Sequence, residues 1–250
     1  NKITGNVELF AIQKWYLSKV RKGTEYFNMS EFVQFPDTIN MDIFNQAIRA
    51  ILEYHDSLRS TFLLSDGTWR LEIGDDINQY YDIEEFFVEN KTEVVAKAQK
   101  VQEKLSVASK LTMSIGIFYI KTEVHILFCV KHLVIDAYSF TILLQDIFSV
   151  YDAMINEKKV NLPSKTHSVA EWIDGINKNK IDVARNYWLY ETQKFFDKNE
   201  KNYNFNYKIN DYHLTIDGEL VEKIKKLGGK GKHNIETVLL CSLIRSVCEL

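Results

Sequence analysis

The sequence lacks any uninterrupted apolar run of 18 residues, and no charged segment followed by an apolar one stands at its start. It therefore predicts neither a transmembrane helix nor a secretory signal, and no membrane partner. A basic excess is also absent, because 31 lysines and arginines stand against 34 aspartates and glutamates and the lysines are scattered. Surfaces that bind nucleic acid need such an excess, so no nucleic-acid partner is expected.

Cysteine and proline are scarce. The three cysteines, Cys129, Cys241 and Cys248, are odd in number and have no paired spacing of the metal-binding kind. Two of them lie inside apolar runs, so reduced, buried thiols in a cytoplasmic protein are the simplest interpretation. One of the only two prolines lies in the polar stretch 156–168, which is therefore the best candidate for a linker.

The sequence does have a large apolar share, arranged in alternating patterns. With 46% hydrophobic residues among 250, the chain can bury a substantial core as one large domain or two medium ones. An α/β (α+β) fold with a mixed sheet and flanking helices is favoured. Periodicity predicts helices over 8–20, 41–55, 90–107 and 138–155, and strands over 27–35, 57–64, 68–73, 111–120 and 124–135.

Beyond the linker the pattern is mainly helical. It predicts helices over 169–180 and 182–196, a strand near 206–216 and two further helical segments. The glycine-rich loop 228–233 between those last two is not a phosphate loop, because no strand precedes it and it lacks the Gly-Lys-Ser/Thr ending.

One short stretch, “FCVKHLVID” at 128–136, carries the candidate chemistry. His132 follows a strand-like run, and Asp136 stands four residues later at the start of a helix. Side chains alternate along a strand, so Lys131 and His132 are expected on opposite faces, and only one of them enters a given cavity. A neutral imidazole suits proton transfer near pH 7, and the start of the following helix would favour a developing oxyanion or enolate.

These residues alone leave several alternatives open. A lone histidine at a strand end is often structural, and the pattern does not choose between acyl transfer and α-proton abstraction. Asp136 is either the N-cap of its helix or the partner of an arginine elsewhere. His132 and Asp136 are too few to hold zinc, so no metal is predicted.

The stretch “KHLVIDAYSF” resembles the His-His-x-x-x-Asp-Gly signature of the condensation superfamily of nonribosomal peptide synthetases. Other segments match that family in order: “LFAIQKWYL” its opening motif with a Pro-Ile-Gln-x-Trp-Phe core, “YFNMSEFV” the next strand, and “YHDSLRSTF” its His-Asp-Ala-Leu-Arg motif. “SVAEWIDGI” and the segments from “YHLTIDGEL” to “IETVLLCSLI” resemble the crossing into a second lobe. The Gln-x-Trp opening and the aromatic residue after Ser139 are more similar to the epimerisation branch than to the peptide-bond-forming branch.

The resemblance implies a two-lobed fold like that of chloramphenicol acetyltransferase, with the second lobe incomplete here. Residues 1–160 would be the N-terminal lobe, residues 161–205 a linker with crossover helices, and residues 206–250 the start of the C-terminal lobe. It also implies that His132 is the catalytic histidine, and that Asp136 and Arg59 form a structural ion pair. Lys131, Ala137 and Ser139 are expected at the channel or at the helix N-terminus.

Several positions depart from the family pattern. Lys131 replaces the first histidine of the signature, Ala137 replaces its glycine, and Phe140 and Thr141 replace the usual Trp-Arg. If the backbone at Ala137 needs a positive φ, the methyl group costs about 1 kcal/mol. The departures predict a weakened or retuned site.

The implied function is inversion of the α-carbon of an aminoacyl or peptidyl thioester by proton transfer at His132. The substrate would be presented on the phosphopantetheine arm of a peptidyl carrier protein, with neighbouring synthetase domains as further partners, and the domain would need no cofactor of its own. A peptide-bond-forming condensation domain, or a degenerate lobe that only docks a carrier protein, is the alternative. The family's opposing glutamate has no matching segment and would lie beyond Leu250.

Both ends of the chain look cut from a longer polypeptide. It begins at Asn1 without a methionine, and it stops at Leu250 within an apolar helical pattern. We therefore expect the 250 residues alone to be catalytically inactive.

Overall fold

The computed structural model describes residues 2–20, 25–35, 38–178, 182–198, 215–228 and 234–248. The chain divides into two compact units, residues 1–189 and residues 190–250. No helix within the described ranges is long and apolar enough to cross a bilayer.

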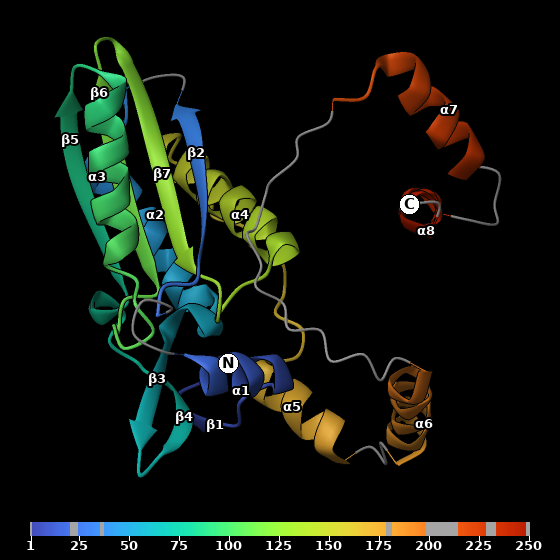
Figure 1. Cartoon of the computed structure of the whole chain (residues 1–250). Coiled ribbons are helices and arrows are strands. Elements are labelled where there is room, and N and C mark those ends of the chain that lie inside the picture. The colour runs from blue at the N-terminus through green and yellow to red at the C-terminus, as the bar shows by residue number, and fades with distance from the viewer. Residues whose placement is uncertain are drawn as a thin grey trace. The chain divides into compact units, whose positions relative to one another are not determined.

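A four-stranded mixed sheet forms the centre of the first unit (Figure 1). Its strand order is β2-β7-β6-β5, with β5 and β6 parallel and the other pairs antiparallel. The two central strands are almost continuously apolar because helices cover both faces of the sheet. The strands are β2 (Asn28–Phe35), β5 (Tyr81–Val88), β6 (Met113–Ile120) and β7 (Glu123–Lys131).

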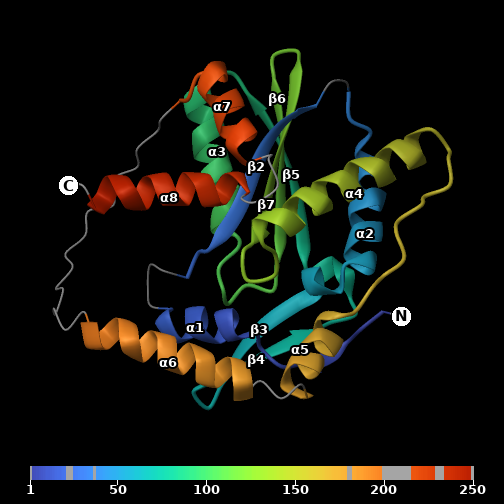
Figure 2. The ribbon, with the colours of Figure 1, turned by 90° about the vertical axis from the view of Figure 1, so that its right-hand side faces the viewer.

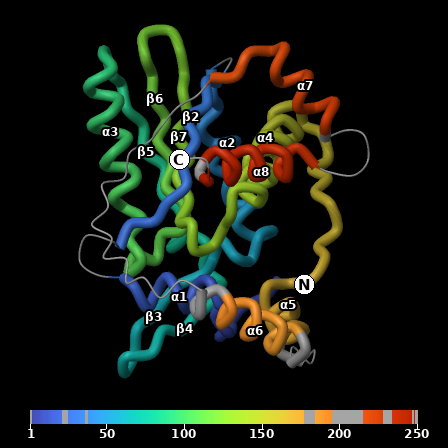
Figure 3. Tube along the Cα trace, turned by 45° about the vertical axis from the view of Figure 1, so that its right-hand side comes forward, coloured from blue at the N-terminus to red at the C-terminus, as the bar shows by residue number. Residues whose placement is uncertain are grey.

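Two helices cover one face of this sheet, and a third covers the other (Figures 2 and 3). Helix α2 (Met41–Tyr54) and helix α4 (Ala137–Ile155) bury their apolar stripes against the face that carries Met113 and Phe128. Phe44, Ile48 and Ile51 of α2 are fully buried, and each contributes about 1.5 to 3 kcal/mol of hydrophobic free energy. Asn40 begins α2, since its side chain accepts a hydrogen bond from the Ile43 N–H at 3.1 Å.

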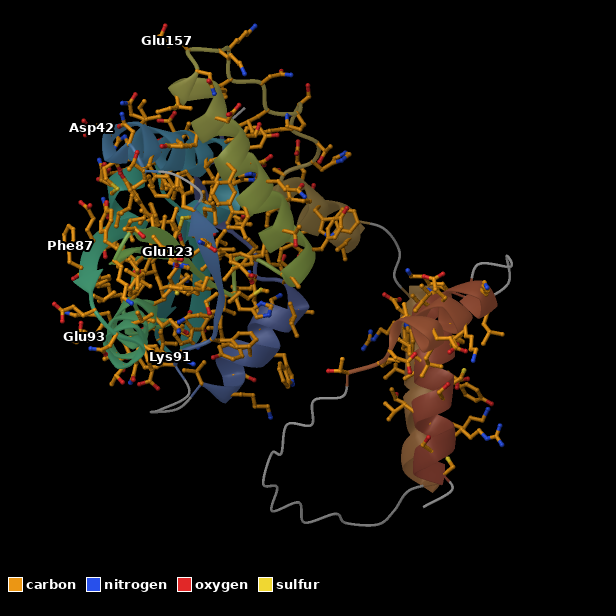
Figure 4. The ribbon with its side chains drawn as sticks, turned by 90° about the horizontal axis from the view of Figure 1, so that it is seen from above. Asp42, Phe87, Lys91, Glu93, Glu123 and Glu157 are labelled. Carbon is orange, nitrogen blue, oxygen red and sulfur yellow. The ribbon has the colours of Figure 1, made fainter. Side chains whose placement is uncertain are left out.

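Helix α3 (Lys91–Glu103) lies close to the opposite face at Gly116. A Cβ at Gly116 would lie 2.7 Å from the ring of Phe118 and 3.1 Å from Val101 of α3. The glycine therefore permits the close approach of helix and strand. On the edge strand β5, Phe87 points outward and is 80% exposed (Figure 4). Lys91 and Glu93 lie in the first turn of α3 (Figure 4).

A small antiparallel sheet of order β1-β4-β3 adjoins the ends of the main strands. Its hairpin turns at Asp66 and Gly67, both with positive φ, as an Asp-Gly hairpin turn requires. Helix α1 (Ala11–Lys19) packs beside it through Leu17 and a cluster that includes Phe62 and Leu133. The strands are β1 (Gly5–Val7), β3 (Ser60–Ser65) and β4 (Thr68–Ile73), and two 3-10 turns are η1 (Asp56–Arg59) and η2 (Ile77–Gln79).

The remaining described elements are helices. Helix α5 (Val169–Lys178) follows the extended segment 156–168, and Ser168 and Glu171 cap its first turn reciprocally. Helix α6 (Asp182–Lys198) runs across the boundary between the two units, and the second unit also holds α7 (Gly218–Gly228) and α8 (Ile235–Cys248). The strand predicted near 206–216 and most of the loop 228–233 lie outside the described residues.

The structure confirms the helices and strands predicted up to residue 155, with three differences. The first residues of the predicted strand 57–64 form η1, and the prediction missed β1 and β5. The strand predicted over 124–135 ends at Lys131, so His132 stands in the turn that follows it. In β5 the adjacent pairs Glu84-Glu85 and Phe86-Phe87 break the two-residue alternation that signals a strand. The prediction of buried thiols holds only for Cys129, because Cys241 and Cys248 are exposed on α8.

Candidate active site

His132 is held in one orientation by hydrogen bonds on its backbone and its ring. It stands in the turn that leaves β7, and its backbone N–H donates to the Phe27 carbonyl at 2.7 Å. Its Nδ1 lies 2.8 Å from the Ile135 carbonyl oxygen. Because a carbonyl only accepts, we assign the proton of the neutral ring to Nδ1, which leaves Nε2 as the basic nitrogen.

The ring of His132 lies against an aromatic stack. Its centroid is 4.4 Å from that of Phe27, and the two planes differ by 9°. Phe27 in turn stacks on Tyr16 of α1, with centroids 4.7 Å apart and planes 19° apart. The sheet edge and α1 thus form a flat aromatic support for the imidazole.

His132 borders a cavity of about 530 Å³. Most of its lining is apolar, which limits the water around a reacting group. The lining residues are Phe10, Ile12, Gln13, Trp15, Tyr16, Phe27, Ser57, Ser60, Leu71, His132, Leu133, Val134, Ile135, Asp136, Ser139 and Val169.

Gln13 connects α1 to the turn that carries His132. Its Nε2 donates to the Leu133 carbonyl at 2.8 Å, and its Oε1 accepts from the Phe10 N–H at 2.9 Å. The side chain is buried and both of its polar ends are engaged, so it fixes the cavity wall. From the sequence Gln13 was predicted only as part of the opening motif, and no role was predicted for Phe27, although a glutamine on the buried face of a helix is a usable signal.

Asp136 is the N-cap of α4. Its carboxylate accepts from the Ser139 N–H at 2.8 Å, and this hydrogen bond, aided by the Ser139 hydroxyl, lowers the pKa of Asp136. Asp136, Ala137 and Ser139 all stand at the solvent-accessible start of the helix. Ala137 is helical and does not belong to the described non-glycine residues with positive φ, so its methyl group causes no backbone strain.

The predicted ion pair between Arg59 and Asp136 is not formed. Arg59 is fully buried and pairs instead with Asp56, at 2.7 Å within the same 3-10 turn. Its other N–H groups donate to four backbone carbonyls, those of Ile3 (3.0 Å), Leu52, Glu53 (3.2 Å) and Gly74 (3.0 Å). All five donors of the guanidinium are therefore used locally, and the carboxylate of Asp136 is engaged with its own helix.

Asp56 serves as an acceptor for three separate segments. Burial by itself would raise the pKa of Asp56, but hydrogen bonds from Arg59 and Lys165 outweigh it and lower that pKa. Lys165 approaches both carboxylate oxygens at 3.1 Å, and the Ile3 N–H donates at 3.3 Å. Asp56 thus joins η1 to the N-terminal segment and to the segment that leads into α5.

Lys131, the last residue of β7, does not line this cavity. It is 1% exposed, its Nζ donates to the Ser109 carbonyl at 2.7 Å, and burial lowers its pKa to about 8. Lys131 therefore lies outside the candidate site.

Comparison with known proteins identifies the family to which this chain belongs. The sequence model described as “Condensation domain” matches residues 3–245. The chain belongs to the condensation-domain family. It is thus a condensation-type domain of nonribosomal peptide synthetases, a family of enzymes.

Curated relatives and solved structures agree with this assignment. The chain is 28% identical over 202 residues to bacitracin synthase 1 of Bacillus licheniformis, which is 74% of this chain and 4% of that protein. It matches the epimerization domain from the third module of tyrocidine synthetase B with a TM-score of 0.63 and 23% identity, over 69% of this chain and 39% of the other. The starter condensation domain of rhizomide synthetase gives a TM-score of 0.60 at 17% identity, over 74% and 47% of the two chains.

The two structural matches confirm the predicted mixed α/β fold of the chloramphenicol acetyltransferase type. The chain spans less than half of either solved chain and a small part of the curated synthase.

Proposed function

We propose that this domain is of the epimerisation type and that His132 moves the α-proton of a carrier-bound aminoacyl or peptidyl thioester. The observation that carries the proposal is the fixed imidazole, whose Nδ1 is engaged by the Ile135 carbonyl while the ring borders an apolar cavity. This leaves Nε2 as the nitrogen that exchanges a proton with a substrate.

The chemistry of a thioester suits such a site. Sulfur donates its lone pair poorly into the carbonyl, so the α-proton is easier to remove than that of an ester or amide. Nε2 of His132 takes this proton, and the N-terminal end of α4, which carries Asp136 and Ser139 at the cavity, favours the enolate oxygen. Inversion then requires a second group that returns a proton to the opposite face of the α-carbon.

The partners follow from the proposed substrate. The substrate would arrive on the phosphopantetheine arm of a peptidyl carrier protein, so the domain needs no cofactor of its own, and further synthetase domains would flank it. We propose residues 1–160 as the N-terminal lobe, 161–205 as the linker and crossover helices, and 206–250 as the start of the second lobe. A cytoplasmic location stays a prediction from the cysteine content.

Peptide-bond formation is the second candidate. The likeness to a starter condensation domain, with a TM-score of 0.60, favours it. In that reaction Nε2 of His132 would orient or deprotonate the acceptor amine instead of a carbon acid. A degenerate lobe that only docks a carrier protein is the third candidate, supported by the replacement of the first signature histidine by Lys131.

One assay separates the three candidates. The polypeptide that carries this domain is given a carrier loaded with an L-aminoacyl thioester in D₂O, with and without an acceptor amine on a second carrier. We expect α-proton exchange without amide formation, and a loss of about 10² to 10⁴ in His132→Ala. His125→Ala is the matched control, because His125 lies on β7, the strand that leads to His132, and contacts Glu123 rather than this cavity.

The other outcomes assign the other candidates. Amide formation without exchange would replace epimerisation by condensation. Carrier binding with neither product would leave only the docking role.

A further inference from the structure

Two histidines of the first unit stack flat on phenylalanines of the same sheet edge. His132 lies on Phe27 with a centroid distance of 4.4 Å and an interplanar angle of 9°, and His125 lies on Phe32 at 5.2 Å and 10°. Phe32 is part of β2, and Phe27 stands just before it. The protein thus contains two phenylalanine–imidazole pairs, and within each pair the two rings are nearly parallel. The two pairs differ in their surroundings.

The two imidazoles differ in which nitrogen is engaged. Nε2 of His125 lies 2.9 Å from the Glu123 carboxylate. In His132 the engaged nitrogen is Nδ1, 2.8 Å from the Ile135 carbonyl. No group within the described residues forms a hydrogen bond with Nε2 of His132. Of the two, His132 therefore keeps this nitrogen available for a reacting proton.

We propose that Phe27 is a positioning residue that fixes the ring orientation and tautomer of His132. This inference deepens the proposed function, since it concerns the same histidine. The terminal torsion of a histidine is broad and roughly two-fold, so a hydrogen bond on Nδ1 alone permits rocking and ring reversal. A flat aromatic surface on one face limits both motions, because stacked rings favour parallel, offset contact.

Phe27 acts on His132 at two points. Its carbonyl accepts the His132 backbone N–H at 2.7 Å, and its ring supports the imidazole. The stacking of Phe27 on Tyr16 and the bond from Gln13 to the Leu133 carbonyl hold this support against α1. Only the ring contact is removed by a substitution at position 27, so its effect can be measured separately from that of the backbone bond.

The test is the tautomer of His132, measured by long-range ¹H–¹⁵N NMR of the labelled chain above pH 8. We expect the Nδ1–H form of His132 in the parent protein, although free histidine prefers the Nε2–H form in water. Phe27→Leu keeps the apolar bulk but removes the aromatic face, and it should give a mixture of tautomers with broadened ring signals. Phe27→Tyr keeps the face and should retain the parent spectrum.

Phe32→Leu is the matched control, and it should alter the ring signals of His125 alone. Phe27 is 40% exposed, so its replacement leaves the core intact, which the backbone amide spectrum verifies. If His132 remained wholly Nδ1–H in Phe27→Leu with unchanged line width, the Ile135 carbonyl alone would fix the ring and the proposal would be wrong.

A kinetic measurement links the positioning role to turnover. In the polypeptide that carries this domain, Phe27→Leu should lower kcat about 3- to 10-fold with KM unchanged, the scale of a lost aromatic pair. Phe27→Tyr should restore it. A shifted tautomer in a protein that never exchanges the α-proton would support the role of Phe27 and reject the proposed function, because the NMR readout does not depend on activity.

Discussion

Arg59 and Lys131 are two fully buried cations that the fold treats in opposite ways. Arg59 is 0% exposed, and its five N–H groups meet four backbone carbonyls and the Asp56 carboxylate. Lys131 is 1% exposed and has a single acceptor within the described residues, the Ser109 carbonyl. The difference shows that a charge remains favourable inside a protein only when enough acceptors replace the water it has lost.

The largest expected effect is the loss of the guanidinium of Arg59. Arg59→Met leaves the Asp56 carboxylate and several carbonyls without their donor, and we expect the free energy of unfolding to fall by about 3 to 5 kcal/mol. Urea denaturation measures it, with the exposed Arg70→Met as the control. A loss below about 1 kcal/mol, the scale of one ordinary hydrogen bond, would show that Arg59 is not an essential buried donor.

Replacement of Lys131, the other buried cation, should raise the free energy of unfolding instead of lowering it. The pKa of Lys131 is lowered to about 8 by burial, against about 10.4 in the unfolded chain, so its charge costs about 3 kcal/mol of stability at pH 7. Lys131→Met removes this cost but also the bond to Ser109, worth about 1 kcal/mol. We expect a net gain of about 2 kcal/mol at pH 7, measured by urea denaturation.

The pH dependence gives the same comparison a second measurement. Between pH 8 and about 10.4 the unfolded chain binds the Lys131 proton and the folded chain does not, so the stability contributed at this position rises with pH. The gain from Lys131→Met should therefore shrink toward high pH in parallel urea titrations. A gain that stayed constant from about pH 7 to about pH 10 would mean that burial does not lower the pKa of Lys131.

Substitution of Asp136 tests whether this residue is a helix cap and not the partner of Arg59. As a helix cap, Asp136→Ala should cost about 1 kcal/mol. Because its pKa is lowered by the Ser139 N–H, its contribution is present above the usual aspartate pKa near 4 and is lost as the pH falls below it. A double-mutant cycle of Arg59→Met with Asp136→Ala should show coupling near zero. Coupling of about 2 kcal/mol or more would restore the predicted ion pair.

Helices, strands and turns could be predicted from the sequence where their local pattern agrees with the fold. Helix α2 carries strong apolar periodicity, and strands β6 and β7 are almost continuous apolar runs, so they could be predicted. The Asp66-Gly67 turn carries its own sequence signal and could be predicted too. Strand β5 is held by its parallel pairing with β6, a contact distant in sequence that local alternation does not report.

The candidate site was predictable in part for the same reason. The order along the chain predicts His132 near the end of a strand and Asp136 at the start of a helix, although the predicted strand ran to residue 135 and β7 ends at Lys131. The partner of Arg59 cannot be predicted from the order along the chain, because Asp56 and Asp136 are both aspartates at turns. Only the three-dimensional path of η1 selects between them. The support from Phe27 and Gln13 depends on long-range packing in the same way.

The smallest expected effect concerns the third partner of Asp56. Lys165 has a side-chain exposure of 31% and lies 3.1 Å from the carboxylate oxygens. An exposed ion pair contributes about 0.2 to 1 kcal/mol and is screened by salt, so Lys165→Ala should cost at most that amount and less in about 1 M NaCl. Lys158→Ala, whose amine stands 4.0 Å from Asp152 with both side chains exposed, is the control and should cost nothing measurable. A salt-independent loss above about 2 kcal/mol in Lys165→Ala would place Lys165 with Arg59 among the essential partners of Asp56, because only a desolvated pair resists screening.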